Sequence, residues 1–239
     1  IDVTGKGFAG GDIEKNGSGP GGGAITNSNG GGQGAGYGGQ GGDAEANQNV
    51  SGFAYGSITQ PLDLGSGGAG ADVAGGYGGG AVFINVTNAL NVSGSILANG
   101  SNGRDSTWGA SGGGSGGSVF IITNTFTGNG SITTNGGAGG AATTGDSGGG
   151  GGGRIAIYST TKTFNGIIRA FGGAAGGTGA RGGGNGTNFS VSNITVLLTV
   201  NQTQAVVVGQ NLTIYGNLSV SAYNLTNFTF SVYIGGVRY

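Results

Sequence analysis

Glycine tracts set the strongest limit on how this chain can fold. Glycine supplies 65 of the 239 residues, and 61 of them lie in residues 1–186. Because glycine has no Cβ, its backbone can approach another backbone closely, but it adds no side chain to a core. Apolar residues still make up 35% of the chain, too large a share for a disordered linker. We therefore expect a thin apolar core and much closely packed backbone.

A 36-residue repeat organises the glycine-rich part, with two short apolar strands followed by a glycine tract. The first strands are residues 81–86, 118–122 and 154–158, and the second strands are residues 94–100, 130–136 and 166–172. Residues 1–7 and 56–59 are fainter copies. One such unit cannot bury its own apolar face and must stack on its neighbours. The sequence predicts an all-β, glycine-rich β-solenoid.

The glycine tracts, such as residues 109–118, 136–153 and 172–186, allow two interpretations. They are either mobile loops or polyproline II-like strands that pack through Cα–H···O contacts, as only glycine permits. Loops of this length are uncommon in compact domains. We favour ordered, polyglycine-II-like packing.

A composition break divides the chain into two predicted domains, residues 1–186 and residues 187–239. Only four glycines lie beyond residue 186, and apolar residues alternate there from Ile194 to Ile234. This period of two indicates half-buried strands of a small β-sandwich, with Gly235-Gly236 as a hairpin turn. About five strands are fewer than the roughly seven of an immunoglobulin-like sandwich. We expect this segment to be completed by another molecule or to be truncated.

Missing residue types exclude several mechanisms. The chain has no His and no Cys, which excludes a Ser-His-Asp triad, a Cys-His nucleophile and an ordinary zinc site. The longest strongly apolar stretch, residues 196–200, is too short to cross a bilayer. Eight basic and nine acidic residues are scattered, so no basic stripe favours nucleic acid. The start at Ile1, without an initiator Met or a signal-peptide pattern, is read as processing or trimming.

Asn-X-Ser/Thr motifs are far more frequent than chance predicts. If the 22 Asn were placed at random relative to the Ser and Thr residues of the chain, about four such motifs would be expected. The chain has 14. The acceptor residues are Asn16, Asn49, Asn85, Asn91, Asn99, Asn129, Asn185, Asn188, Asn193, Asn201, Asn211, Asn217, Asn224 and Asn227. The alternative is that polar strand faces are simply rich in Asn, Ser and Thr. We predict N-glycosylation, which together with the lack of Cys indicates a prokaryotic, and more specifically an archaeal, exterior.

Other motifs are weaker. Residues 5–10 match a dinucleotide-binding pattern, but no helix is predicted after them to hold a pyrophosphate. Residues 67–72 resemble a single copy of a calcium-binding nonapeptide that normally works in tandem. The acids lie in turns rather than in pairs on one strand, and Trp108 and the tyrosines are interpreted as surface or subunit contacts rather than as a sugar platform. We predict no catalytic residue, no cofactor and no metal ligand.

Residues 55–68, 113–120 and 149–158 resemble the large glycine-rich repeat proteins exported to microbial cell surfaces, bacterial and archaeal. The resemblance covers roughly residues 1–175 and implies an extracellular β-solenoid body with a structural or adhesive role. The last segment is similar to Asn/Thr-rich β-sandwich modules of archaeal surface-layer and filament proteins. No catalytic residues are implied by either resemblance.

The sequence therefore predicts a non-enzymatic, N-glycosylated extracellular structural protein, a subunit of a cell-surface filament, sheath or coat. It is expected to form a homopolymer through β-strand contacts, with the opening residues 1–4 as a candidate donor strand. The alternative is a surface adhesin or carbohydrate-binding module. No membrane span, nucleic acid or small-molecule substrate is predicted.

Overall fold

The computed structural model describes residues 1–25, 30–44, 52–192, 233–234 and 237–238, and all regular elements among them are β-strands. The strands are β1 (Ala81–Asn91), β2 (Ser95–Leu97), β3 (Ser118–Gly128), β4 (Ser131–Thr133), β5 (Arg154–Phe164), β6 (Ile167–Arg169), β7 (Thr187–Val191), β8 (Tyr233–Ile234) and β9 (Val237–Arg238). Two compact units result, Ile1–Asn193 and Ile194–Tyr239. The predicted all-β class is confirmed for these residues.

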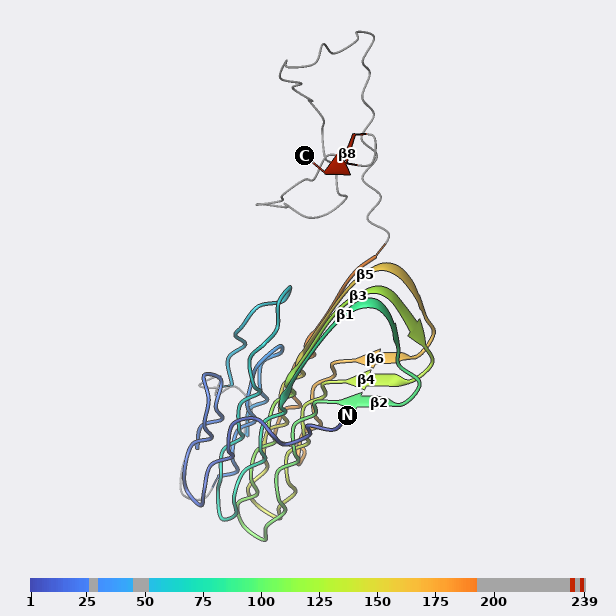
Figure 1. Cartoon of the computed structure of the whole chain (residues 1–239). Helices are drawn as coiled ribbons and strands as arrows, with labels where there is room; N and C mark the ends of the chain where they lie inside the picture. Colours follow the sequence, from blue (N-terminus) through green and yellow to red (C-terminus); the bar gives the residue numbers. More distant parts are fainter. Residues whose placement is uncertain (26–29, 45–51, 193–232, 235–236, 239) are drawn as a thin grey trace. The chain divides into compact units, whose positions relative to one another are not determined.

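The first unit is a parallel β-solenoid of about three turns (Figure 1). A long-strand sheet has the order β1-β3-β5-β7, and a short-strand sheet has the order β2-β4-β6. The register follows the repeat, since Ile121 pairs with Ile157 and Ile96 pairs with Ile132. The predicted β-solenoid is therefore confirmed.

The strands differ from the predicted ones in length and number. Each long strand that begins a turn has 11 residues, because its polar second half, such as STTKTF in β5, continues the ladder beyond the apolar stretch. Asp2 bridges Leu97 in parallel, which places the opening copy at the edge of the short-strand sheet. The prediction of a strand at residues 56–59 is wrong, since these residues form a bent loop and no strand.

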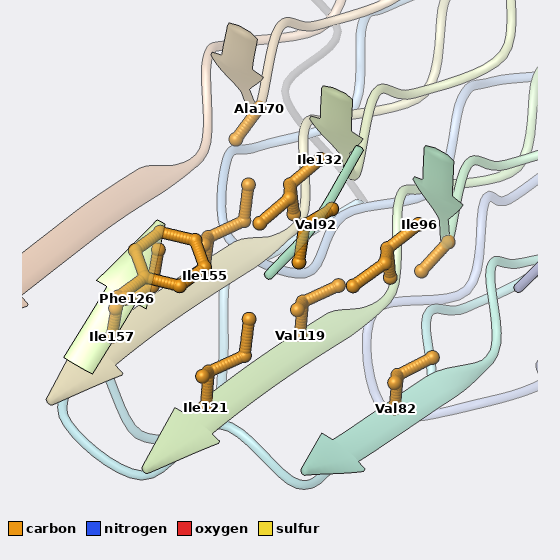
Figure 2. Packing of buried hydrophobic residues seen from close by; sticks show 11 residues of the cluster. Val82, Val92, Ile96, Val119, Ile121, Phe126, Ile132, Ile155, Ile157 and Ala170 are labelled. Atoms are coloured by element: carbon orange, nitrogen blue, oxygen red, sulfur yellow. The ribbon is translucent and has the colours of Figure 1, made fainter. Parts of the chain in front are cut away.

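The apolar core lies between the two sheets (Figure 2). It consists of in-register ladders, because identical positions of successive turns stack on one another. The ladders from the long strands are Val82, Val119 and Ile155, and then Ile121 and Ile157. Ile96 and Ile132 face them from the short strands, and Phe126 stacks on Phe164 at a centroid distance of 4.7 Å. The core is thin, as the composition predicts.

The glycine tracts are ordered and bonded to one another through the backbone. In the segment 110–117, the hydrogen-bond partner of the N–H changes with a period of three residues. Ala110, Gly113 and Gly116 donate to Gly145, Gly148 and Gly151, whereas Ser111, Gly114 and Gly117 donate to Arg104, Ser101 and Ala98. Gly112 and Ser115 donate to Ala69 and Ser66. Three residues per turn is the period of a polyproline II helix.

The carbonyls of the same segment accept from three further segments. Ala110 and Gly113 accept from Gly32 and Ala35, Gly112 and Ser115 accept from Gly76 and Gly79, and Ser111 and Gly114 accept from Gly140 and Gly137. Segment 110–117 thus has six neighbours, and we call this assembly of glycine segments the glycine bundle. A Cβ at Gly113 would fall on the carbonyl oxygen of Gly137 and within 2.7 Å of that of Ala138. Only glycine fits at such positions.

The boundary predicted after residue 186 is too early for the solenoid. β7 pairs with β5, with Ala156 opposite Phe189, so residues 187–191 belong to the long-strand sheet. The loss of glycine marks the end of the glycine bundle, because the strands that follow each tract are poor in glycine. In the second unit, Ile234 pairs with Val237 in an antiparallel hairpin, as predicted. The remaining strands of the predicted sandwich fall on residues 194–232, outside the described residues.

Candidate functional site

An aromatic ladder runs across the outer face of the long-strand sheet. Phe83 stacks on Phe120 at 5.1 Å between ring centroids, Phe120 meets Tyr158 edge-on at 5.8 Å, and Tyr158 lies 5.6 Å from Phe189. Small Ala156, the direct partner of Phe120, leaves room for the ring of Tyr158 two residues further along β5. Phe120 is 6% exposed, whereas Phe83 is 54% exposed. The ladder therefore has an open end at β1.

The outer edge of β1 is open as well. Among the described residues, β1 pairs only with β3, so one row of its backbone N–H and C=O groups faces away from the sheet. Its sequence, AVFINVTNALN, contains no charge and no proline, although natural sheet edges usually carry such protection against pairing. Phe83, Asn85 and Thr87 are all exposed on this strand. This edge, with Phe83 at the end of the ladder, is the candidate functional site, and we call it the β1 edge.

A buried polar node ties the loop of residues 55–64 to the outer face of the sheet. Arg154, only 5% exposed, donates from Nε and from a terminal nitrogen to the carbonyl of Tyr55 at 2.9 and 2.7 Å. Its guanidinium lies 5.5 Å from the centre of the Tyr37 ring. The Tyr37 hydroxyl lies 2.7 Å from Oγ of Ser118, which donates to the Asp63 carbonyl. The loop therefore covers β3 and β5 and leaves Phe83 on β1 exposed.

Burial raises the pKa of Tyr55 to about 12, against a hydrogen bond with Ser66 that lowers it. Burial also raises the pKa of Tyr37 above its usual value of 10.0. The folded chain thus keeps phenol protons that the unfolded chain releases, so the free energy of unfolding should fall as pH rises from about 10 to 12. Denaturant titrations across this range measure the slope. Tyr55→Phe should make the slope shallower, and an unchanged slope would contradict the assignment to this node.

The predicted glycosylation residues divide between described and other parts of the chain. Asn16, Asn85, Asn91, Asn129, Asn185 and Asn188 are exposed, which leaves room for a glycan. Asn99 is half-buried, and its Oδ1 accepts the N–H of Asn135 at 2.7 Å. Asn49, Asn193, Asn201, Asn211, Asn217, Asn224 and Asn227 lie outside the described residues. Glycosylation stays a prediction for all of them.

The ends of the glycine segments opposite the sheets form turns, which we call the tip. Trp108 is 67% exposed there, and a shallow depression of about 460 Å³ is lined by Asp12, Ile13, Asp72, Val73, Ala74 and Arg104. Oδ2 of Asp72 accepts the N–H of Gly109 at 2.8 Å, so this carboxylate links two segments of the tip that lie 37 residues apart in the sequence. In the part of the chain that the structure describes, no three His, Cys, Asp or Glu side chains gather as metal ligands.

The weaker motifs have structural roles in the described residues. In the dinucleotide-like pattern, Gly7 donates to the Gly78 carbonyl at 2.7 Å, and next to the pattern Gly11 donates to the Gly68 carbonyl at 2.9 Å. These glycines pack in the glycine bundle, where their N–H groups are already bonded. No helix among the described residues is long and apolar enough to span a membrane.

No protein-family model, curated protein or solved structure matches the chain. The assignment of a site therefore rests on its geometry. Sequence reasoning identified neither the aromatic ladder nor the Arg154 node. The signal for the ladder was present, since Phe83 and Phe120 occupy the third position of their strands and Tyr158 the fifth position of β5.

Proposed function

We propose that the chain is a non-enzymatic extracellular structural protein, a subunit of a cell-surface filament, sheath or coat that assembles through β-strand contacts. The observation that carries this proposal is the β1 edge, an uncharged 11-residue strand with an exposed aromatic ring and no strand partner among the described residues on one side. An edge of this kind is a template for pairing with another chain. The glycine bundle supports a structural role, because its interior is mostly glycine backbone with a few small or polar side chains such as Ser66, Ser111 and Ser115.

The geometry favours propagation in one direction. The strands of the long-strand sheet are parallel and in register, and a second copy that pairs with β1 continues the same ladder. Contacts of unlike surfaces form filaments unless they close into a ring. The opening residues 1–4 are less suitable as a donor strand, because Val3 already donates to the Leu97 carbonyl at 2.8 Å and Leu97 donates to that of Ile1 at 2.9 Å.

Phe83→Lys should strongly reduce assembly. The change removes the open end of the aromatic ladder and places a charge on the β1 edge, where aromatic stacking of about 1 kcal/mol or more is lost. We expect half-assembly to need a protein concentration at least roughly fivefold higher. Light scattering and negative-stain microscopy of purified protein measure this.

Ile13→Lys is the matched control. Ile13 is 61% exposed at the tip, and the substitution replaces an exposed apolar side chain by a charged one, as Phe83→Lys does. Assembly of this variant should equal that of the original chain. Unchanged assembly of Phe83→Lys, with both variants folded, would show that the β1 edge is not the contact. Loss of assembly on deletion of residues 1–4 alone would assign the contact to the edge of the short-strand sheet.

Native material should carry several N-glycans. The exposed positions Asn85, Asn91 and Asn129 lie on or beside the long strands β1 and β3. Asn188 lies in β7, at the opposite edge of the long-strand sheet from β1, and Asn185 lies just before β7. We expect an intact mass above the 22.6 kDa of the polypeptide and loss of the increment after glycosidase treatment. Glycopeptide mapping identifies the occupied sites, with the exposed Asn85 expected ahead of half-buried Asn99. A native mass equal to that of the polypeptide would contradict the prediction.

The second candidate function is a surface adhesin or carbohydrate-binding module. It is favoured by Trp108, 67% exposed in the tip, and by the nearby depression with its aliphatic and charged lining. Trp108 is the single tryptophan of the chain, so fluorescence reports on the tip alone. Saturable quenching of the Trp108 fluorescence when glycans are added to a discrete monomer would support this function. Regular polymers whose fluorescence is not quenched by glycans would support the structural function.

A further inference from the structure

Asn-Gly pairs are the sites in proteins where an asparagine side chain reacts most readily with its own backbone. The backbone nitrogen of the glycine attacks Cγ of the asparagine, the amide nitrogen leaves as ammonia, and a succinimide ring forms. Water then opens the ring to aspartate or isoaspartate, so the balance is one water consumed and one ammonia released. The reaction needs a glycine N–H that is not held in a hydrogen bond and an asparagine side chain that can turn toward it.

Within the glycine bundle, both groups are held by the residue one repeat further along. The pair Asn99-Gly100 accepts the N–H of Asn135 on Oδ1 at 2.7 Å and donates the glycine N–H to the carbonyl of Asn135 at 2.8 Å. The pair Asn102-Gly103 binds Ala138 in the same two ways, at 2.9 and 2.8 Å. These asparagines fasten one turn of the solenoid to the next.

Two more pairs are held in the same manner. Asn135-Gly136 binds the N–H and the carbonyl of Phe171, both at 2.8 Å. At the last turn, Oδ1 of Asn185 accepts the N–H of Gly172 at 3.1 Å, and Gly186 donates to the Ala170 carbonyl at 2.7 Å. In each pair the attacking nitrogen and the side chain that it would attack are both engaged.

Asn165-Gly166, in the corner between β5 and β6, differs from all of these pairs. Asn165 is exposed, its side chain makes no hydrogen bond to a described residue, and the N–H of Gly166 has no acceptor among them. The corner of the preceding turn has Asn129-Gly130, where Asn129 is also exposed but Gly130 donates to the Val92 carbonyl at 2.9 Å. The two corners thus differ in whether the attacking N–H is bonded.

We propose that, among the Asn-Gly pairs that the structure describes, Asn165 is the modification site at which this chain forms a succinimide and ages to aspartate and isoaspartate, while the asparagines of the glycine bundle are protected. Asn165 is followed by Gly166 and Ile167 and is not a glycosylation motif, so a glycan does not shield it. The product carries a negative charge at the corner. In the isoaspartate form it also adds a methylene to the backbone that joins the long-strand sheet to the short-strand sheet.

The test uses the folded, unglycosylated full chain, incubated in mildly alkaline buffer and analysed by peptide mapping with mass spectrometry. A net hydrogen bond contributes about 1 kcal/mol, so Asn165 should convert roughly fivefold faster than Asn129, and Asn99, Asn102 and Asn135 should be slower still. In denaturant, where every N–H is exposed, the rates of these Asn-Gly pairs should become similar. Asn165→Gln should abolish conversion at this corner and leave the other sites unchanged.

Equal rates at Asn165 and Asn129 in the folded chain would overturn the proposal, as would faster conversion at any asparagine of the glycine bundle. No conversion at Asn165 when the denatured chain converts there would also overturn it, because the corner would then be protected. Alanine at Gly166 is not a usable control, since its Cβ would fall on the Gly130 carbonyl.

Discussion

Gly113→Ala is expected to destabilise the chain by about 3 kcal/mol or more, enough to unfold much of it at moderate temperature. Gly113 lies in the central segment of the glycine bundle, with backbone on every side. An added Cβ would meet the carbonyls of Gly137 and Ala138, which cannot move without loss of their own hydrogen bonds. Overpacking against backbone is less easily relieved than overpacking against a flexible side chain. Thermal and denaturant unfolding measure the change.

Gly94→Ala is the matched control for this substitution. Gly94 precedes β2, and no atom lies within 4 Å of the position that a Cβ would take. The same chemical change there should alter the free energy of unfolding by no more than about 0.5 kcal/mol. If both variants melt at the same temperature, the glycine bundle is not the closely packed body described above.

Arg154→Ala is expected to be the most destabilising change of a charged side chain. It removes two hydrogen bonds to the Tyr55 carbonyl and the contact with the ring of Tyr37, and it leaves a carbonyl without its donor. Loss of a charged donor to a buried acceptor costs about 3 kcal/mol, which lowers the melting temperature by roughly 6–12 °C in a chain of this size. The loop of residues 55–64 should also become open to proteases.

Arg169→Ala is the control that separates the effect of losing the Arg154 contacts from the effect of replacing an arginine in general. Arg169 is exposed on β6, where its guanidinium lies 5.5 Å from the centre of the Phe171 ring. We expect a change within about 0.5 kcal/mol. Equal losses in the two variants would mean that the Arg154 node does not hold the loop.

The repeat made the solenoid predictable, because stacking places the same residue type at the same point of each turn. Val119 above Ile155 and Ile96 above Ile132 are visible in the amino-acid sequence as a 36-residue spacing. That the glycine tracts are structurally ordered could also be predicted, because closely packed backbone requires glycine at many positions.

Features that depend on contacts between remote and dissimilar segments were not predictable. Nothing in the residues near Arg154 shows that its partners are Tyr37 and Tyr55, 117 and 99 residues away. The open end of the ladder at Phe83 depends on the loop 55–64, which covers β3 and β5, and the sequence suggested a strand at residues 56–59 of this loop. The end of the solenoid was placed too early because β7 continues the ladder after the glycine stops.

The glycine bundle has a consequence for how this chain responds to temperature. Unfolding an ordinary domain exposes mainly apolar surface, which raises the heat capacity, whereas exposure of peptide groups lowers it. Here a large part of the buried surface is peptide backbone, since segments such as 110–117 are surrounded by other backbone rather than by apolar side chains. We therefore expect a small heat capacity change of unfolding per residue and a broad, flat curve of stability against temperature. We expect a chain built in this way to keep its fold in the cold, where cores held by the hydrophobic effect weaken.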